Sequence, residues 1–390
     1  MDSVLKKVMR RIKPSRREER KVEKEVRGFV EELEGRIEKK GYDAEVLVGG
    51  SYAKGTWLPD PDVDIFVRFE KGNNLSERLR EILKGLKYEE VRASRNYYKI
   101  GRFEVIPILR ISSPEEAKNP MDVSPFHVDF VRKNLKRPDD VRLLKVFCKA
   151  MGVYGAESYV SGFSGYVLEL LICYYGSFKR LFEEVENWRP KVYLSFSKKR
   201  EKLSEAKLKS PLILIDPVLP TRNAAASLNY ENFSKFVFNA RLFLRRPSTK
   251  FFEVKPMDED FLRRRSSKRG TKLFLKKVKV KGKRDVFLAK LKRKLDRIKS
   301  RVERHGFSVY DYGFQELGDR VLVYFEFETW RCSKRGRHLG PPVWVPKEHF
   351  ERFLKKWKDV YVHGTRLVAD VERVDDARVL LRDLLREYDI

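Results

Sequence analysis

The stretch VGGSYAKGTWLPDPDVDIFV, residues 48–67, combines a glycine turn with two aspartates that lie two positions apart. Residues 63–69, VDIFVRF, predict a β-strand that carries the second aspartate, Asp64. Side chains two apart on a strand point to the same face, so Asp62 and Asp64 should converge. Converging carboxylates repel each other unless a cation lies between them, and Mg²⁺ prefers oxygen ligands. The stretch therefore indicates metal and phosphate chemistry.

A third carboxylate should come from a neighbouring strand. Residues 103–111, FEVIPILRI, predict such a strand, and Glu104 lies there among apolar neighbours, where an unpaired carboxylate would be costly. Phosphoryl transfer commonly uses two divalent ions about 4 Å apart. We therefore expect Asp62, Asp64 and Glu104 to be the catalytic residues and to hold two Mg²⁺ ions.

The turn Gly49-Gly50-Ser51 lies where the first strand should give way to a helix. Small residues there let backbone N–H groups approach a triphosphate, and Ser51 adds a hydroxyl group. The stretch is not a Walker A loop: Gly50 and Gly55 have the spacing, but Thr56 stands where the lysine must be. An aspartate pair or a glycine turn alone is usually a solvated turn, whereas the two in this order are far more specific.

The charge of the chain points to a polyanionic partner. Lys and Arg total 86 against 57 Asp and Glu, which gives a formal net charge of +29 over 390 residues. Basic groups in such excess displace counterions from a phosphate backbone. A thermophilic or salt-adapted surface is the alternative, but it normally adds both signs of charge. With 42% hydrophobic residues, the chain can bury the cores of two to four domains.

Membrane attachment and secretion are not expected. No apolar run approaches the length of a transmembrane helix, and the basic N-terminus lacks the apolar core of a secretory signal. The cysteines, Cys148, Cys173 and Cys332, form no CxxC pair and no zinc-like cluster with the five histidines. We expect a reduced, cytoplasmic protein without structural zinc.

The first part of the chain, residues 1–134, predicts a small α/β layer domain. Residues 1–40 should be helical, and residues 44–52 should form a strand that ends in the glycine turn. An amphipathic helix, residues 75–86, should lie between the second and third strands.

The middle part, residues 135–250, predicts a mostly helical domain, and the last part, residues 251–390, an α+β region. The expected middle helices are 139–155, 161–185 and 232–246. In the last part, the expected strands are 271–282, 320–330 and 366–374, and the expected helices are 284–306, 347–360 and 375–388. Residues 257–270 look like a charged linker or loop. Small α+β domains of this kind often present sheets to RNA.

The glycine turn followed by the aspartate pair resembles the catalytic palm of DNA-polymerase-beta-type nucleotidyltransferases. Over nearly its whole length the chain resembles the archaeal, class I CCA-adding enzymes, which are tRNA nucleotidyltransferases. The stretches that carry this resemblance are 49–69, SPFHVDFV at 124–131, VRLLKVFCKAMGVYGAE at 141–157, SGFSGYVLELLICYYGSF at 161–178, DPVLPTRNAAASL at 216–228, KRGTKLF at 268–274 and HLGPPVW at 338–344.

The resemblance implies a catalytic palm, a helical neck and C-terminal tRNA-binding domains. It implies stepwise addition of C, C and A to the tRNA 3′ end from CTP and ATP, with Mg²⁺ as cofactor. The partner would be the acceptor stem and TΨC arm of tRNA, bound by a monomer or a homodimer. A poly(A) polymerase-like or other template-independent nucleotidyltransferase and a non-catalytic RNA-binding protein stay open as alternatives.

The resemblance also assigns site residues. Asp62, Asp64 and Glu104 align with the metal-binding residues of the family. The residues that align with nucleotide-binding positions are Gly50, Ser51 and Lys54, then His127, Lys145 and Tyr154 for the triphosphate or sugar, and Arg222 for the incoming base. Two positions depart from the family, because Glu104 replaces an aspartate and Lys54 replaces an arginine. Lysine keeps the charge but loses bidentate phosphate geometry.

Apart from the family, four of these residues have ordinary structural explanations. His127 could cap the helix that follows, and Lys145 could extend from an apolar helix to solvent. Tyr154 could be a core tyrosine, and Arg222 could support a turn.

Overall fold

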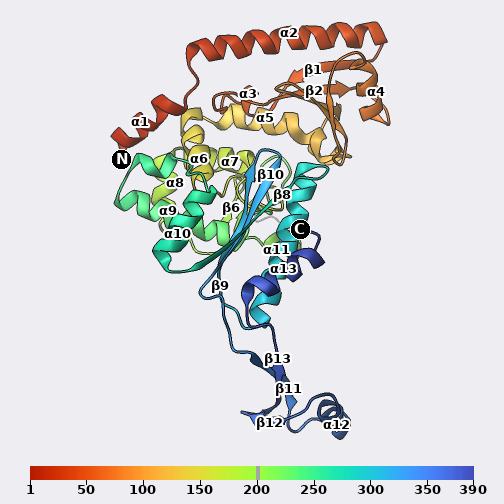
Figure 1. Cartoon of the computed structure of the whole chain (residues 1–390). Coiled ribbons are helices and arrows are strands. Elements are labelled where there is room, and N and C mark those ends of the chain that lie inside the picture. Colours follow the sequence, from red (N-terminus) through yellow and green to blue (C-terminus); the bar gives the residue numbers. More distant parts are fainter. Residues whose placement is uncertain (199–202) are drawn as a thin grey trace. The chain divides into compact units, whose positions relative to one another are not determined.

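The computed structural model describes residues 1–198 and 203–390, which form two compact units, Met1–Val254 and Lys255–Ile390 (Figure 1). Each unit has its own sheets and helices. The finer division of the first unit near residue 134 stays a prediction.

A five-stranded mixed sheet organises the start of the first unit. Its strands are β1 (Ala44–Val48), β2 (Val63–Phe69), β3 (Glu89–Val91), β4 (Tyr97–Ile100) and β5 (Phe103–Leu109), in the order β1-β2-β5-β4-β3. The three expected strands are confirmed, and the short strands β3 and β4 were not predicted. Only β2 and β5 are parallel, and all other neighbours are antiparallel. The helix α4 (Leu75–Ile82), shorter than expected, precedes the β3–β4 hairpin.

The register of this sheet aligns chemically important residues on adjacent strands. Asp64 on β2 pairs with Glu104 on β5, and Glu104 in turn pairs with Lys99 on β4. Directly paired residues of neighbouring strands project to the same face. The expected proximity of the Glu104 strand to the aspartate strand is therefore confirmed.

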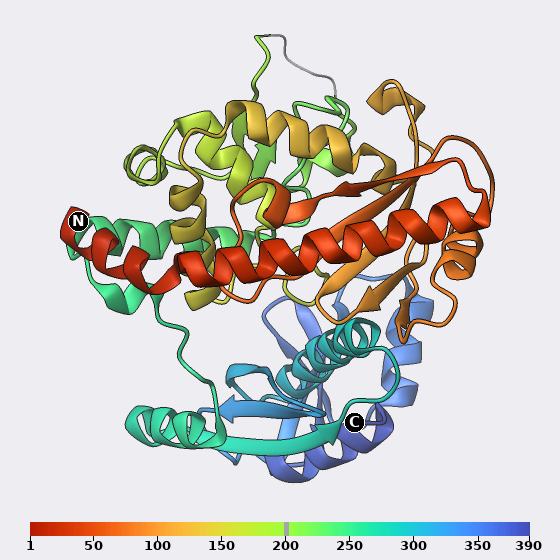
Figure 2. The ribbon, with the colours of Figure 1, turned by 90° about the horizontal axis from the view of Figure 1, so that it is seen from above.

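The N-terminal helical region is two helices rather than one. They are α1 (Asp2–Ile12) and α2 (Arg16–Lys40), and Pro14 lies between them. Ser15 caps α2 in a capping box with Glu18, and Gly41, in the left-handed conformation, ends it. Figures 1 and 2 show α2 running along the sheet, against which it buries an apolar stripe.

A helical region completes the first unit. Its helices are α5 (Ser124–Asn134), α6 (Pro138–Ala150), α7 (Gly165–Tyr175), α8 (Phe178–Val185) and α9 (Tyr230–Arg245), with a short parallel pair, β6 (Val192–Leu194) and β7 (Leu212–Leu214). Phe147 lies at the centre of its core, in ring contact with Phe182, Phe236 and Phe243.

The prediction of one continuous helix over residues 161–185 is wrong. α7 ends at Gly176, whose φ of +80° suits glycine, and the Ser177 side chain caps α8. The break lets α8 turn back and pack its apolar face onto α7 and α9.

The second unit contains two antiparallel sheets. The first has the order β8-β10-β9, formed by β8 (Lys272–Lys279), β9 (Val309–Leu317) and β10 (Arg320–Phe327). The second has the order β11-β13-β12, formed by β11 (Arg335–Pro342), β12 (Val360–His363) and β13 (Arg366–Glu372). The helices are α10 (Glu259–Arg269), α11 (Arg284–Arg304), α12 (Lys347–Lys356) and α13 (Ala377–Glu387).

The expectation of a linker or loop at residues 257–270 is wrong, because most of this segment is the helix α10. Asp258 caps its first turn, and Gly270 ends it with a φ of +70°. Leu262 is fully buried and anchors the helix against the sheet through Leu322 and Tyr324.

None of the helices in the described residues is both long enough and apolar enough to span a membrane.

Candidate active site

The glycine turn and the second aspartate form one structural unit. The short helix α3 (Gly50–Ala53) begins directly after β1, and the Gly49 N–H donates a hydrogen bond of 2.8 Å to the backbone oxygen of Asp64. Gly50 has a φ of +59°, and a Cβ atom there would lie 1.5 Å from Asp64 Oδ2. Only glycine therefore lets the Asp64 carboxylate lie against this turn.

Three carboxylates are called the acidic edge below: Asp64 on β2, Glu104 on the adjacent strand β5, and Asp62 directly before β2. Lys99 Nζ lies 3.1 Å from Asp62 Oδ1 and 3.5 Å from Glu104 Oε1. Burial and the neighbouring Glu104 charge raise the pKa of Asp64 to about 6. Burial also raises the pKa of Glu104, although Lys99 opposes this. The Lys99 contacts to Asp62 and Glu104 and the Lys54 charge acting on Asp64 leave the repulsion among the three carboxylates only partly relieved.

The acidic edge fits Mg²⁺ by its donor chemistry. In the described part of the chain, no three His, Cys, Asp or Glu side chains are already assembled as a metal centre. Mg²⁺ is usually held by one or two carboxylates together with substrate phosphates, so a complete protein cage is not needed. Burial first, and then repulsion from Glu104, raises the pKa of Asp64, so a cation bound beside it would stabilise the charged carboxylate.

Two lysines meet at a buried glutamate in what we call the Glu169 network, made of Glu169, Lys54, Lys145 and Thr56. Glu169, on α7, is 1% exposed, and it accepts hydrogen bonds of 2.5 Å from Lys54 Nζ and from Thr56 Oγ1. Lys145 Nζ lies 3.6 Å from Glu169 and donates to the carbonyl and hydroxyl oxygens of Thr56. Burial lowers the pKa of Lys145 to about 8, although the Glu169 charge opposes this.

Lys145 does not extend to solvent, as its alternative explanation required, and Tyr154 lies beside it. Lys145 is buried, so the expectation that it could reach bulk solvent is wrong. A Cβ atom on Gly165 would lie 3.1 Å from the Tyr154 hydroxyl and 3.7 Å from Lys145 Cε, so both side chains approach the start of α7. Burial and the Glu169 charge raise the pKa of Tyr154 to about 12, so it stays protonated.

His127 and Arg222 meet at a second buried carboxylate, Asp216. Asp216 Oδ2 lies 3.2 Å from His127 Nε2 and accepts a 3.0 Å bond from Arg222 Nη1. His127 lies inside α5 and does not cap it, whereas Arg222 does support the turn that contains it. Tyr166 donates to the same carboxylate.

Ring contacts connect the Glu169 network with the Asp216 group, which comprises Asp216, His127, Tyr166 and Arg222. The Tyr166 ring lies 4.3 Å from the His127 ring, and Lys54 Nζ lies 5.6 Å from the Tyr166 ring centre. Ser51 lies in α3, where its backbone oxygen accepts the Thr56 N–H. The acidic edge, the Glu169 network and the Asp216 group thus contain all the site residues expected from the sequence, apart from Gly50, Ser51 and Tyr154 beside them.

Five residues of these groups were not expected from the sequence as site residues: Thr56, Lys99, Tyr166, Glu169 and Asp216. Glu169 left a usable signal, because it is the only charged residue in the apolar run 165–175. A buried charge of this kind requires a partner. Lys99, Tyr166 and Asp216 depend on contacts between distant segments, and no local pattern marks them.

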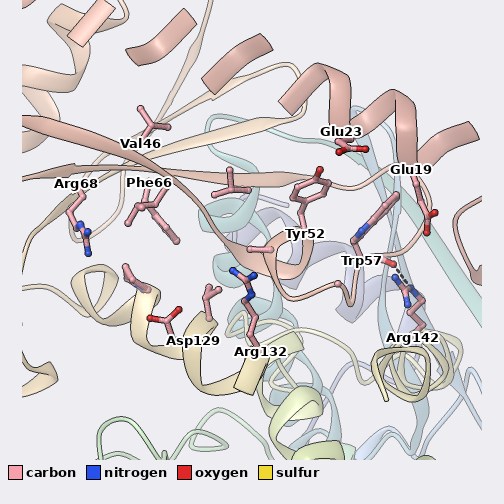
Figure 3. Close-up of a pocket in the computed structure, with 16 residues that line it drawn as sticks. Glu19, Glu23, Val46, Tyr52, Trp57, Phe66, Arg68, Asp129, Arg132 and Arg142 are labelled. Atoms are coloured by element: carbon pink, nitrogen blue, oxygen red, sulfur yellow. Dashed lines mark hydrogen bonds between the residues drawn. The ribbon is translucent and has the colours of Figure 1, made fainter. Parts of the chain in front are cut away.

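A separate cavity of about 790 Å³ lies beside α3, and its lining includes Glu23, Tyr52, Trp57, Arg132 and Arg142 (Figure 3). Arg142 Nε donates to the Trp57 carbonyl oxygen at 2.8 Å, the contact drawn as a dashed line. None of the site residues expected from the sequence lines this cavity.

Three family profiles match successive parts of the chain. Residues 30–137 match a nucleotidyltransferase domain, residues 139–253 the second domain of tRNA nucleotidyltransferase, and residues 269–388 the C-terminal domain of the CCA-adding enzyme. Solved structures of similar fold include a cytoplasmic RNA terminal U-transferase. It has a TM-score of 0.51 and 15% identity, and the alignment covers 66% of this chain and 100% of the other.

A Cid1 poly(U) polymerase bound to MgATP also has a TM-score of 0.51, with 14% identity, over 64% of this chain and 98% of the other. At these identities the likeness shows the fold alone. The matched first and second domains place the chain in the nucleotidyltransferase class.

Curated relatives define the family more narrowly. The CCA-adding enzyme of Nanoarchaeum equitans is 35% identical over 343 residues, covering 84% of this chain and 83% of the relative. Those of Sulfolobus acidocaldarius and Methanothermobacter thermautotrophicus are 35% and 34% identical and cover 92% and 98% of this chain, and 85% and 88% of the relatives. The chain therefore belongs to the family of CCA-adding enzymes, and the expected fold class of palm, helical middle and α+β C-terminal part is confirmed.

Proposed function

We propose that the chain adds C, C and A in turn to the 3′ end of tRNA, using CTP and ATP and releasing pyrophosphate. One observation carries the proposal: Asp64 pairs with Glu104 across parallel strands, beside a glycine turn that has no room for a Cβ atom. Family membership narrows the acceptor from RNA in general to tRNA.

The acidic edge would hold two Mg²⁺ ions, one through Asp62, Asp64 and Glu104 and the other through Asp62 and Asp64. When bound, the ions lower the pKa of the primer hydroxyl and neutralise charge on the leaving group. Lys99 would compete with the cations for the carboxylates of Asp62 and Glu104, both of which it contacts. Gly50 keeps the Asp64 carboxylate free of steric obstruction.

The nucleotide would bind through positive charge and aligned donors. Lys54 and Lys145 supply two ammonium groups against the single carboxylate of Glu169, so the network keeps a net positive charge for the triphosphate. Ser51 and Gly50 contribute backbone N–H groups and a hydroxyl. The other proposed contacts are His127 and Tyr154 to the triphosphate or sugar and Arg222 to the base.

In the proposed reaction the primer 3′-hydroxyl oxygen attacks the α-phosphate of CTP or ATP. A new P–O bond forms, the bond between the α-phosphate and the bridging oxygen breaks, and pyrophosphate leaves with the electron pair. The hydroxyl proton passes to solvent, and we assign no side chain as general base. Positioning and charge stabilisation supply most of the catalysis in phosphoryl transfer of this kind.

The second unit would bind the acceptor stem and TΨC arm of tRNA. The helix α11 exposes Lys290, Arg293 and Arg297, which lie three and four residues apart on one face. Such a row can follow a phosphate backbone. The cytoplasmic location is part of the same proposal.

The test is a product ladder from tRNA that ends at the discriminator base, with radiolabelled CTP and ATP. The proposed function predicts three added nucleotides in the order C, C, A, followed by arrest. A long A tail would instead establish a poly(A) polymerase. Absence of Mg²⁺-dependent pyrophosphate release with tRNA would establish a non-catalytic protein.

A further inference from the structure

A single buried carboxylate, Asp216, joins three segments of the first unit. Its side chain is fully buried. Oδ2 lies 3.2 Å from His127 Nε2 and 3.0 Å from Arg222 Nη1. Oδ1 accepts bonds of 3.0 Å from the Tyr166 hydroxyl and from the Val218 N–H. Both oxygens therefore have two donors each, which is full satisfaction for a buried carboxylate.

The carboxylate is held in its charged form. Burial alone would raise the pKa of Asp216, but the hydrogen bond and charge of His127, the Val218 N–H and the Arg222 charge lower it overall. A buried charge without such partners would be strongly unfavourable. The donors and Asp216 consequently fix one another's positions.

The loop that carries Arg222 is tied to Asp216 twice. The Asp216 N–H donates to the Arg222 carbonyl oxygen at 3.0 Å, and the Arg222 N–H donates to the Leu219 oxygen at 2.8 Å. The guanidinium then returns to the carboxylate at the start of the same loop. Releasing the carboxylate contact would free the Arg222 side chain while the backbone turn remains.

Arg222 is anchored but still accessible. Its side chain is 47% exposed, and among the described residues its recorded side-chain partner is Asp216 alone. A guanidinium has five N–H donors, so most of them can reach acceptor atoms on a base. His127, on the other side of Asp216, contacts Tyr166, which lies below Lys54 of the Glu169 network.

We propose that Asp216 is a positioning residue that fixes the Arg222 guanidinium relative to His127, and that the choice of the incoming base depends on it. The residue proposed to select the base, Arg222, and the residue proposed to contact the triphosphate or sugar, His127, are then both held by Asp216. This inference rests on the proposed function, because it assigns Arg222 to the base and His127 to the triphosphate.

Asp216→Asn is the informative variant. It keeps the shape but removes the charge, and its NH₂ cannot accept a hydrogen bond, so either Arg222 and His127 or the Val218 N–H loses its acceptor. Asp140→Asn is the matched control. Asp140 is also a buried carboxylate of the first unit, accepts the Phe178 N–H at 2.9 Å and pairs with Arg137 at 3.0 Å, away from the site.

The assay compares kcat/KM for CTP with UTP on tRNA ending at the discriminator base, and for ATP with GTP on tRNA ending in CC. In Asp216→Asn the ratio of correct to wrong nucleotide should fall about tenfold or more, the loss expected for a charge-assisted hydrogen bond. Asp140→Asn should lower thermal stability and leave both ratios unchanged. In an Arg222→Ala background, Asp216→Asn should lower the ratios no further.

Three results would overturn the proposal: unchanged ratios in Asp216→Asn, equal losses for all four nucleotides, or full additivity with Arg222→Ala. Hydrogen exchange of the segment 216–224 gives a reading independent of catalysis, and it should accelerate in Asp216→Asn but not in Asp140→Asn. If the wild-type chain adds no nucleotide, the proposed function fails by itself. Unchanged exchange in Asp216→Asn would then also reject the positioning role.

Discussion

The acidic edge and the Glu169 network lie in the same unit but carry opposite net charge. In the acidic edge, Lys99 contacts two of the three carboxylates, Asp62 and Glu104, and the charge that acts on Asp64 is that of Lys54. The Glu169 network places two ammonium groups around one carboxylate. The acidic edge therefore has an excess of negative charge, and the Glu169 network an excess of positive charge. The first is suited to divalent cations and the second to phosphate oxygens, which together match a metal–nucleoside triphosphate.

The two groups also differ in burial. The Asp62 side chain is 68% exposed, whereas the Glu169 side chain is 1% exposed. Replacing Asp64, which is half-buried, relieves repulsion with Glu104, and a substitution at Asp62 should change chemistry with little effect on folding. A substitution in the buried network should change both.

Asp64→Ala should have the largest effect on activity. Without this carboxylate, nucleotide incorporation should fall by about 10³-fold or more, because transition-state charge loses its main stabilisation. Filter binding should show that tRNA affinity persists, and the melting temperature should not fall, since Asp64 is repelled by its neighbours. Incorporation at the wild-type rate would refute the metal assignment.

Glu169→Gln should lower both activity and stability. Breaking a buried ion pair costs about 3 kcal/mol, which urea unfolding can measure. The kcat/KM for CTP should also fall, since Lys54 and Lys145 lose the group that orients them. Glu183→Gln, an exposed glutamate on α8, is the control and should leave both quantities unchanged. A stable variant with normal kcat/KM would show that the Glu169 network is not needed for nucleotide binding.

The pH dependence should report on Lys145. The ammonium is charged below its pKa of about 8 and loses its proton above it, so the grip on the triphosphate should weaken as pH rises. The kcat/KM for CTP should fall by about tenfold per pH unit above that value. Lys145→Met should have a lower kcat/KM for CTP below a pH of about 8 and should lack the decrease above that pH. If Lys145→Met keeps the decrease, another group titrates there.

Lys99→Met should have the smallest effect. A partly exposed ion pair contributes at most about 1 kcal/mol, so the free energy of unfolding in a chelator should fall by no more than that. Excess Mg²⁺ should abolish the difference, since the cation replaces the ammonium at the acidic edge. A larger loss that persists in Mg²⁺ would mean that Lys99 has a structural role instead.

Local sequence patterns predicted the aspartate pair of the acidic edge because its geometry is local: Asp62 lies directly before β2 and Asp64 on it, two positions apart. Glu104 was marked by its place in an apolar strand, β5, which pairs with β2. The break at Gly176-Ser177 and the helix between Asp258 and Gly270 also left capping signals. The charge pattern of residues 257–270 outweighed those signals there, since the helix α10 buries only one large apolar side chain, Leu262. In residues 161–185 the continuous apolar pattern outweighed them.

The partners of the two buried carboxylates, Asp216 and Glu169, could not be predicted in the same way. Asp216 meets His127 across 89 positions of sequence, and Lys54 meets Glu169 across 115. No periodicity encodes contacts between such distant segments. Only the packing of α5, α7 and the loop after β7 decides them.

The most direct test of the opposite charge of the acidic edge and the Glu169 network measures the affinities of Mn²⁺ and of CTP in two variants, Asp64→Asn and Glu169→Gln. Mn²⁺ affinity is read by electron paramagnetic resonance, and CTP affinity by calorimetry in a chelator. Asp64→Asn should weaken Mn²⁺ by about tenfold or more and leave metal-free CTP binding unchanged or tighter. Glu169→Gln should weaken CTP and spare Mn²⁺. Equal losses of both ligands in both variants would contradict the separation of metal and triphosphate between the two groups.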